Sequence, residues 1–218
     1  LCEATETHNE TEGLDCDESN PNINPDAEEL CDGIDNDCDG TGQFDLSDAD
    51  VTFIGDTIET GRQLSSGDFN GDGIPDIAVG AYDSSIDYKN GVVYLFYGPD
   101  FGGAIQEYDA KINGDYYQQF GSYPMTSADF NNDGVDDLML MSYKAEVFLF
   151  NGPLSGDLTT GDAAHSLTSE ATWYAQSELT QIGDINDDSH VDFIWTFPRS
   201  NTEGIFEGKY HGEATIFY

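Results

Sequence analysis

Basic residues are scarce in this sequence. Six lysines and arginines stand against 44 aspartates and glutamates, which gives a formal net charge of −38. A surface of that sign repels nucleic acid and anionic membranes, so we exclude both as partners. No apolar run approaches the roughly 18 residues that a membrane-spanning helix needs, so we expect no membrane insertion. Part of the acidic surplus is expected to be solvated surface, and part to converge on cations.

Sequence motifs of catalysis are also absent. The chain has no G-x-S-x-G, phosphate-binding loop, H-E-x-x-H or dinucleotide-binding fingerprint. The four histidines, His8, His165, His190 and His211, are scattered and lack the spacing of metal ligands. Carboxylate pairs are uninformative in a chain with 44 acidic residues. We therefore predict that the chain is not an enzyme.

Cysteine is absent after residue 38. Cys2, Cys16, Cys31 and Cys38 lie in a stretch rich in acidic residues, Asn and Pro, with few apolar residues. Such a segment cannot fold around an apolar core, so we predict that residues 1–45 are held by disulfides and cations. Four cysteines allow three pairings, and Cys2–Cys16 with Cys31–Cys38 is favoured because it closes the shortest loops. Zinc ligation is an alternative, although the spacing fits no zinc pattern.

What the chain does have is an acidic loop that recurs three times. Residues 68–76 read D-x-N-x-D-G-x-x-D, and the same positions recur 61 and 55 residues further on. Alternating oxygen-bearing side chains in a tight loop, with a backbone carbonyl at the seventh position, suit Ca²⁺. The predicted ligands are Asp68, Asn70, Asp72, Ile74 and Asp76; Asp129, Asn131, Asp133, Val135 and Asp137; and Asp184, Asn186, Asp188, His190 and Asp192.

These loops are not EF-hands. The twelfth position, where an EF-hand needs Glu, is Val79, Leu140 or Trp195. Apolar, β-prone residues follow each loop, and a second such run comes later in each repeat. We predict strands at 77–80, 92–97, 138–141, 146–150, 193–196 and 213–218. The expected fold is all-β, with an N-terminal segment at 1–45 and three repeats in 46–218, at about 50–100, 101–153 and 154–218.

The third loop differs from the other two. Ser189 occupies the sixth position, where Gly73 and Gly134 stand in the first two loops. A left-handed backbone is less favourable for serine than for glycine. We therefore predict a weaker or differently shaped third site.

The N-terminal segment contains a fourth loop of this kind. Asp35, Asp37 and Asp39, followed by Gly40, repeat the opening of a calcium loop, and Asp15 and Asp17 offer a second nucleus. The pattern D-C-D followed by C-D-G-x-D-N-D-C-D-G resembles a bacterial cysteine-rich metal-binding motif over about 25 residues. Asp26 replaces the usual Gly of that motif. The acidic residue that closes the motif is Asp45, because Gln43 stands at the position where it is expected. The ligands that this resemblance implies are Asp15, Asp17, Asp35, Asp37, Asp39 and Asp45.

The three repeats resemble FG-GAP repeats of integrin-α-type, VCBS-like β-propellers. Phe120-Gly121 matches the leading Phe-Gly of that repeat, Gly80-Ala81 its trailing Gly-Ala, and the three loops its metal cage. The resemblance implies that each repeat is a four-stranded blade with calcium at one rim. Closed propellers have about four to eight blades. Three blades are therefore expected to be part of a longer propeller or to be completed by another chain, and an unrelated three-repeat β fold is a further alternative.

These observations predict a non-enzymatic, calcium-binding protein of the cell surface or extracellular space, secreted and bacterial. The chain does not begin with Met and shows no signal peptide, which fits a removed leader. Its role is expected to be structural, adhesive or partner-binding, with a protein or glycan ligand at the long loops 82–91 and 198–212. Two alternatives are a subunit of a calcium-dependent filament, polymerised through β-strand edges, and accessory repeats of a larger secreted enzyme.

Overall fold

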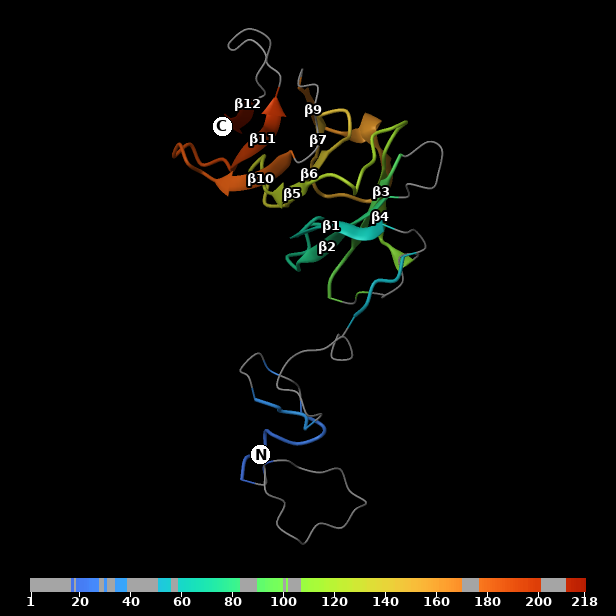
Figure 1. Ribbon diagram of the computed structural model, residues 1–218, viewed down its shortest axis with the longest axis vertical. Coiled ribbons are helices and arrows are strands. Elements are labelled where there is room, and N and C mark those ends of the chain that lie inside the picture. Colours follow the sequence, from blue (N-terminus) through green and yellow to red (C-terminus); the bar gives the residue numbers. More distant parts are fainter. Residues whose placement is uncertain are drawn as a thin grey trace. The chain divides into compact units, whose positions relative to one another are not determined.

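The structure is a computed structural model that describes residues 17, 19–27, 30, 34–38, 51–55, 59–82, 90–99, 101, 107–169, 177–200 and 211–218. Contacts between residues divide the chain into two compact units, Leu1–Asp50 and Val51–Tyr218. In the described part of the second unit, all regular elements except one 3-10 helix are strands, which confirms the all-β prediction (Figure 1). Nowhere in that part is a helix long and apolar enough to cross a membrane.

The described strands include all six that were predicted from apolar runs, with bounds close to the predicted ones. Their bounds are β1 Glu59–Gly67, β2 Asp76–Tyr82, β3 Val92–Phe96, β4 Ala110–Asn113, β5 Met125–Ala128, β6 Asp137–Met141, β7 Glu146–Phe150, β8 Gly156–Thr159, β9 His165–Thr168, β10 Glu178–Gly183, β11 Asp192–Ser200 and β12 His211–Phe217, with a 3-10 helix η2 at Thr160–Asp162. β2 and β6 are buried almost throughout, because their near-continuous apolar sequences place side chains on both faces of a covered sheet.

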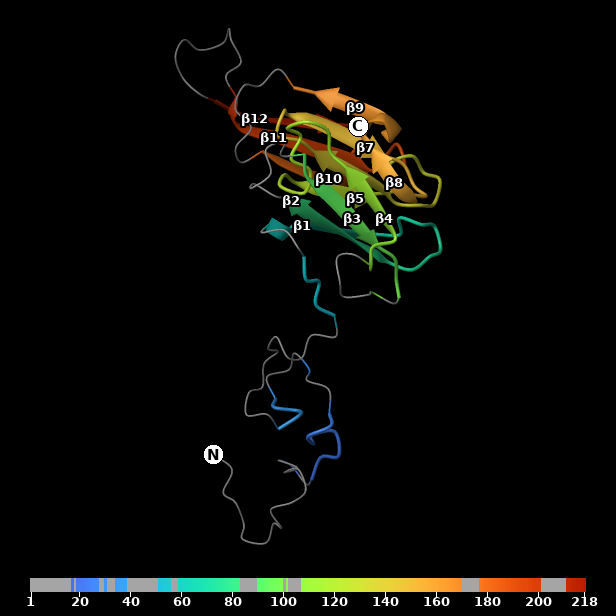
Figure 2. The same ribbon diagram turned by 90° about the vertical axis from the view of Figure 1, so that its right-hand side faces the viewer.

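The described strands form three sheets, each beginning with an antiparallel meander. The first sheet has the order β1-β2-β3-β4-β8, the second β5-β6-β7-β9, and the third β10-β11-β12. The acidic loops connect β1 to β2, β5 to β6 and β10 to β11. The sheets lie next to one another in chain order (Figure 1, Figure 2), an arrangement consistent with propeller blades.

The sheets do not follow the predicted repeat boundaries. β8 and β9 both fall in residues 154–218, yet β9 is the outer strand of the second sheet and β8 pairs in parallel with β4 of the first. The chain thus completes two earlier sheets before it begins the third at β10. Little in the local sequence of these short strands specifies which edge they join, because all their residues except the partly buried Leu158 are exposed.

The cores lie between the sheets. Sheets one and two share a cluster that includes Phe69, Leu95, Leu138 and Phe150, each at most 1% exposed. Sheets two and three share a second cluster around Met139, Trp195 and others. Each repeat therefore depends on its neighbour to cover its apolar face, as repeat architectures generally do.

The Phe-Gly and Gly-Ala motifs meet at the contact between the first two repeats. Phe120 is completely buried, and its N–H donates to the carbonyl of Asn90 (3.0 Å). A Cβ atom on Gly80 would lie 2.6 Å from the Cα of Gly121. The two glycines therefore allow backbone to pack directly on backbone, which gives the paired motifs a physical role.

Candidate metal centres in the acidic loops

The first acidic loop is organised by its first aspartate. The Asp68 carboxylate accepts hydrogen bonds from the N–H groups of Gly71 (2.8 Å), Asp72 (3.1 Å) and Gly73 (2.8 Å). Asn70 Oδ1 accepts from the N–H of Asp72 at 2.8 Å. These contacts fold the backbone around the side chains at the first, third and fifth positions.

The ninth residue of the loop fastens it to the sheet. Asp76 is fully buried, and its carboxylate accepts from the N–H groups of Phe69 (2.8 Å), Asn70 (3.2 Å) and Gly98 (2.9 Å). Gly98 comes two residues after β3, so this carboxylate ties the loop to the end of the neighbouring strand. Burial raises the pKa of Asp76 above its ordinary value, although the amide donors oppose the shift.

The second loop has the same arrangement. Asp129 accepts from the N–H groups of Asp133 (3.0 Å) and Gly134 (2.9 Å). Asp137, also fully buried, accepts from Phe130 (3.1 Å) and Gly152 (2.9 Å). Burial raises the pKa of Asp137 to about 6, with amide hydrogen bonds opposing the rise.

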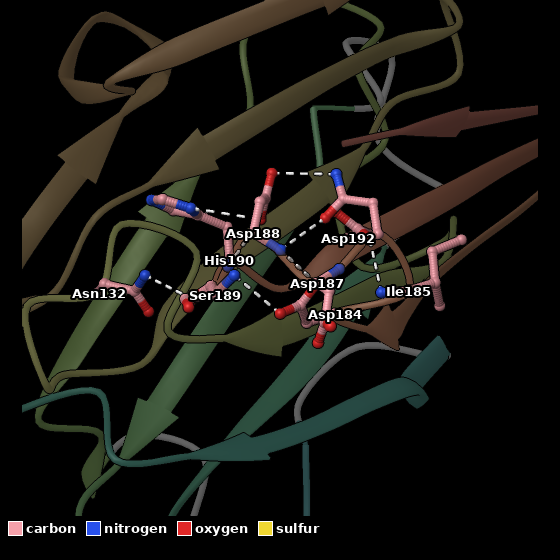
Figure 3. Close-up of polar contacts among 9 residues, drawn as sticks. Asn132, Asp184, Ile185, Asp187, Asp188, Ser189, His190 and Asp192 are labelled. Atoms are coloured by element: carbon pink, nitrogen blue, oxygen red, sulfur yellow. Dashed lines mark hydrogen bonds and ion pairs between the residues drawn. The ribbon is translucent and has the colours of Figure 1, made fainter.

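The third loop keeps this shape in spite of its serine (Figure 3). Asp184 accepts from the N–H groups of Asp187 (2.6 Å), Asp188 (3.1 Å) and Ser189 (2.8 Å). Asp188 in turn accepts from the N–H of His190 at 2.9 Å, and this bond contributes most to lowering the pKa of Asp188. Ser189 has a φ of 73°, so it adopts the left-handed conformation that glycine adopts in the other loops. Whether the third site is weaker stays a prediction.

The fourth position of each loop is a feature that the sequence reasoning missed. Gly71, Asn132 and Asp187 all have positive φ, at 81°, 59° and 68°. Glycine, asparagine and aspartate are the residues that tolerate this conformation best. The recurrence of these residue types at the fourth position could have predicted a left-handed backbone there.

The loops also contact one another, which the sequence did not predict. Asp136, the eighth residue of the second loop, exchanges two hydrogen bonds with Asp68: its N–H donates to the Asp68 carbonyl, and its Oδ2 accepts from the Asp68 N–H, both at 2.9 Å. Asn132 Nδ2 donates to the carbonyl of Ser189 at 2.6 Å. Neighbouring loops are therefore joined by hydrogen bonds that use both backbone and side-chain groups.

The donor set fits a hard cation. The predicted side-chain ligands of each loop are three aspartates and one asparagine, and these oxygens suit Ca²⁺ better than a transition metal. Across the described ranges, however, no three His, Cys, Asp or Glu side chains are grouped so that they could hold a metal ion. The first carboxylate of each loop is directed at backbone N–H groups instead. The ligand roles of all fifteen loop residues, including the carbonyls of Ile74, Val135 and His190, stay predictions.

In the N-terminal unit, Asn36 joins two turns. It is 5% exposed, its carbonyl accepts from the N–H of Asn24 (2.9 Å), and its Oδ1 accepts from the N–H of Leu30 (3.0 Å). Asp17 accepts from Ser19, and these hydrogen bonds lower the pKa of Asp17. Of the other predicted ligands and cysteines, Asp35, Asp37 and Cys38 are described, whereas Asp15, Asp39, Asp45, Cys2, Cys16 and Cys31 lie outside the described residues.

Cys38 is disulfide-bonded. Its partner and the pairing of the four cysteines stay predictions. Most of the two long loops predicted to bind ligands, residues 83–89 and 201–210, also lies outside the described residues.

Comparison with known proteins identifies two motifs. Residues 60–96, which include the first acidic loop and β1 to β3, match the FG-GAP repeat family. Residues 15–43 match the Cu-binding MopE family, described as "Putative metal-binding motif". Both resemblances inferred from the sequence are therefore confirmed over these ranges.

A curated relative is phosphatidylinositol-glycan-specific phospholipase D from Bos taurus. The two sequences are 28% identical over 175 residues, which is 72% of this chain but 20% of that protein. The chain thus spans about a fifth of the length of the relative it matches.

Proposed function

We propose that this chain is a non-enzymatic, calcium-binding repeat protein, secreted by a bacterium to its surface or surroundings, with a structural, adhesive or partner-binding role. The observation that supports it best is the common hydrogen-bonded shape of the three loops. In each, the carboxylate of the first aspartate accepts from the N–H groups of the fifth and sixth residues, and the side-chain oxygen of the third residue accepts from the N–H of the fifth. FG-GAP repeats are typical of extracellular proteins.

Calcium is a better candidate than copper. The family name of the N-terminal motif includes copper, but copper sites are usually built from imidazole, thiolate or thioether groups. Residues 15–43 contain no histidine or methionine; of their three cysteines, Cys38 is disulfide-bonded, and Cys16 and Cys31 are predicted to be. Carboxylates and amides remain as the main donors, and these suit Ca²⁺.

Calcium would act on stability rather than on a reaction. Each blade loop carries three predicted carboxylate ligands in a protein with a net charge of −38, so a divalent cation bound among them would relieve repulsion in the folded state. A cation that binds the folded chain and not the unfolded chain stabilises it by mass action. A rigid blade could then present the long loops to a protein or glycan, or a sheet edge to another copy.

The test is calcium titration by calorimetry, with thermal unfolding in parallel, on two matched variants of the third loop. Asp188→Asn removes a predicted ligand, whereas Asp187→Asn removes the same charge from the adjacent residue, which is not one. We expect Asp188→Asn to abolish or weaken one site at least tenfold and Asp187→Asn to change affinity little. An equal effect of the two variants, or tighter binding of Cu²⁺ than of Ca²⁺ to the native chain, would contradict the proposal.

The match to the phospholipase D favours a second candidate, accessory repeats of a larger secreted enzyme. The similarity covers about a fifth of that enzyme, so it is compatible with a repeat region that carries no catalytic group of its own. We expect this chain alone to release no product from a phosphatidylinositol-glycan substrate. Turnover by the isolated chain would overturn both candidates, because both assign the chain no chemistry.

The filament alternative depends on open sheet edges. Within the described strands, β12 pairs with β11 on one side, and no strand is added on its other side. Exposed strand edges are templates for pairing. Light scattering at several protein concentrations, with calcium and after its removal, tests this idea: calcium-dependent polymers would support the filament, and a monomer under both conditions would exclude it.

A further inference from the structure

A cavity of about 390 Å³ lies between the second and third sheets. Its apolar lining consists mainly of Phe130 in the second acidic loop, Met139 on β6, Leu149 on β7, Phe193 on β11 and Phe217 on β12. We call these five residues the apolar socket. Four of them, Phe130, Leu149, Phe193 and Phe217, are only partly buried. Large apolar side chains that line a cavity lose contacts on the open side.

The same five positions are closed between the first and second sheets. Each socket residue has an equivalent one repeat earlier, at the same loop position or in the same strand register. In the order given above, the equivalents are Phe69, Ala78, Leu95, Leu138 and Phe150. All five are at most 1% exposed. Leu154 belongs to the same buried cluster and is itself 4% exposed. Its N–H donates to the carbonyl of Phe69 at 2.8 Å, which fixes the leucine beside the first loop.

Leu154 ends a Gly152-Pro153-Leu154 segment, and the glycine of that segment has a second task. Its N–H donates to Asp137 Oδ1, as the N–H of Gly98 does to Asp76 Oδ1, both at 2.9 Å. The corresponding atom of the third loop, Asp192 Oδ1, is buried and has no hydrogen-bond partner. The register of β11 and β12 puts the matching donor directly after Tyr218, the last residue of the sequence.

Two features of the third repeat are thus unsatisfied, a buried acceptor and an apolar socket. In the second repeat one short segment satisfies both. Gly152 donates to the buried acceptor on Asp137, and Leu154, two residues later, fills the apolar interface. A buried carboxylate oxygen without a donor costs free energy, and so does an unfilled apolar cavity. Either feature alone could have several explanations, but their spacing matches one segment.

We propose that the apolar socket binds a leucine-sized apolar side chain, delivered by a Gly-Pro-Leu segment attached to Tyr218. The glycine N–H donates to Asp192 Oδ1, and the apolar side chain two residues later enters between Phe130, Leu149 and Phe217. The N–H of that residue donates to the carbonyl of Phe130, as Leu154 does to Phe69. The segment is attached rather than separate because its glycine must continue the register of β12.

The test compares the chain ending at Tyr218 with two extended chains, one carrying Gly-Pro-Leu and one carrying Gly-Pro-Ser. Both extensions supply the glycine N–H, and they differ in the group that enters the socket. Burial of one leucine side chain should raise the melting temperature of the Gly-Pro-Leu chain by roughly 3–10 °C over the Gly-Pro-Ser chain. Val191→Phe, which fills the socket from its lining, should abolish most of that difference.

Three results would overturn the proposal. Equal melting temperatures of the two extended chains would mean that the socket accepts no apolar side chain. A shift of the same size in the unextended chain on adding free acetyl-Gly-Pro-Leu-amide would mean that attachment is unnecessary. A stable dimer of the unextended chain that Val191→Phe dissolves would assign the socket to a second copy.

Discussion

Asp137 should make the metal-free protein less stable as the pH rises from about 4 to 7. Burial raises the pKa of this carboxyl from 3.8 to about 6 in the folded chain. Between those two values the folded state holds a proton that the unfolded state has released, so unfolding becomes easier with increasing pH. The stabilising contribution is fully present below pH 3.8 and is lost as the pH passes through about 6.

The size of this effect follows from the shift. A difference of about 2.2 pKa units, 6 minus 3.8, corresponds to at most about 3 kcal/mol at 1.36 kcal/mol per unit. Water that reaches the loop reduces this, and we expect about 2 kcal/mol. Asp76, whose pKa is also raised by burial, contributes in the same direction.

Bound calcium should reverse the sign of this pH dependence. A bound cation requires the ionised carboxylate, so protons compete with it below about pH 6. In saturating calcium the free energy of unfolding should therefore rise with pH over the range in which it falls without metal. A chain whose loops bind no cation would show the same falling slope in both conditions.

The assay is urea unfolding followed by tryptophan fluorescence, at intervals from pH 4.5 to 7.5, in buffer freed of metal by a chelating resin. Asp137→Asn should remove about 2 kcal/mol of the pH dependence. The exposed Glu178→Gln makes the same change of charge and should remove little. If the native chain and Asp137→Asn had the same pH slope, the carboxylate would not be titrating where its burial places it.

Three further substitutions test the packing. Ser189→Gly should stabilise the chain by about 0.5–1 kcal/mol, because glycine adopts the left-handed backbone without strain; a loss of stability in urea would contradict this. Gly80→Ala should destabilise by about 3 kcal/mol or prevent folding, since its Cβ would meet the Gly121 backbone at 2.6 Å, and an unchanged melting temperature would refute the close contact. Leu154→Ala should cost about 2–5 kcal/mol by opening a cavity between the first two sheets; a cost below about 1 kcal/mol would show that this leucine does not fill the interface.

The loops and the strands beside them were determined by the sequence. Asp, Asn and Asp at the first, third and fifth positions, with glycine at the sixth in the first two loops, encode a turn through short-range hydrogen bonds, and all three loops adopt that turn. The apolar runs after each loop became β2, β6 and β11 because continuous burial needs continuous apolar sequence. Even Ser189 kept the loop shape, since the carboxylate of Asp184 holds its N–H at 2.8 Å.

Only the tertiary structure decided how the repeats join. The assignment of β8 and β9 to earlier sheets, the exchange of hydrogen bonds between Asp136 and Asp68, and the socket between the second and third sheets all link residues distant in the chain. Local sequence specifies the conformation of a segment but not which exposed edge or cavity it will meet. Those contacts depend on the packing of one sheet against the next, which no single repeat contains.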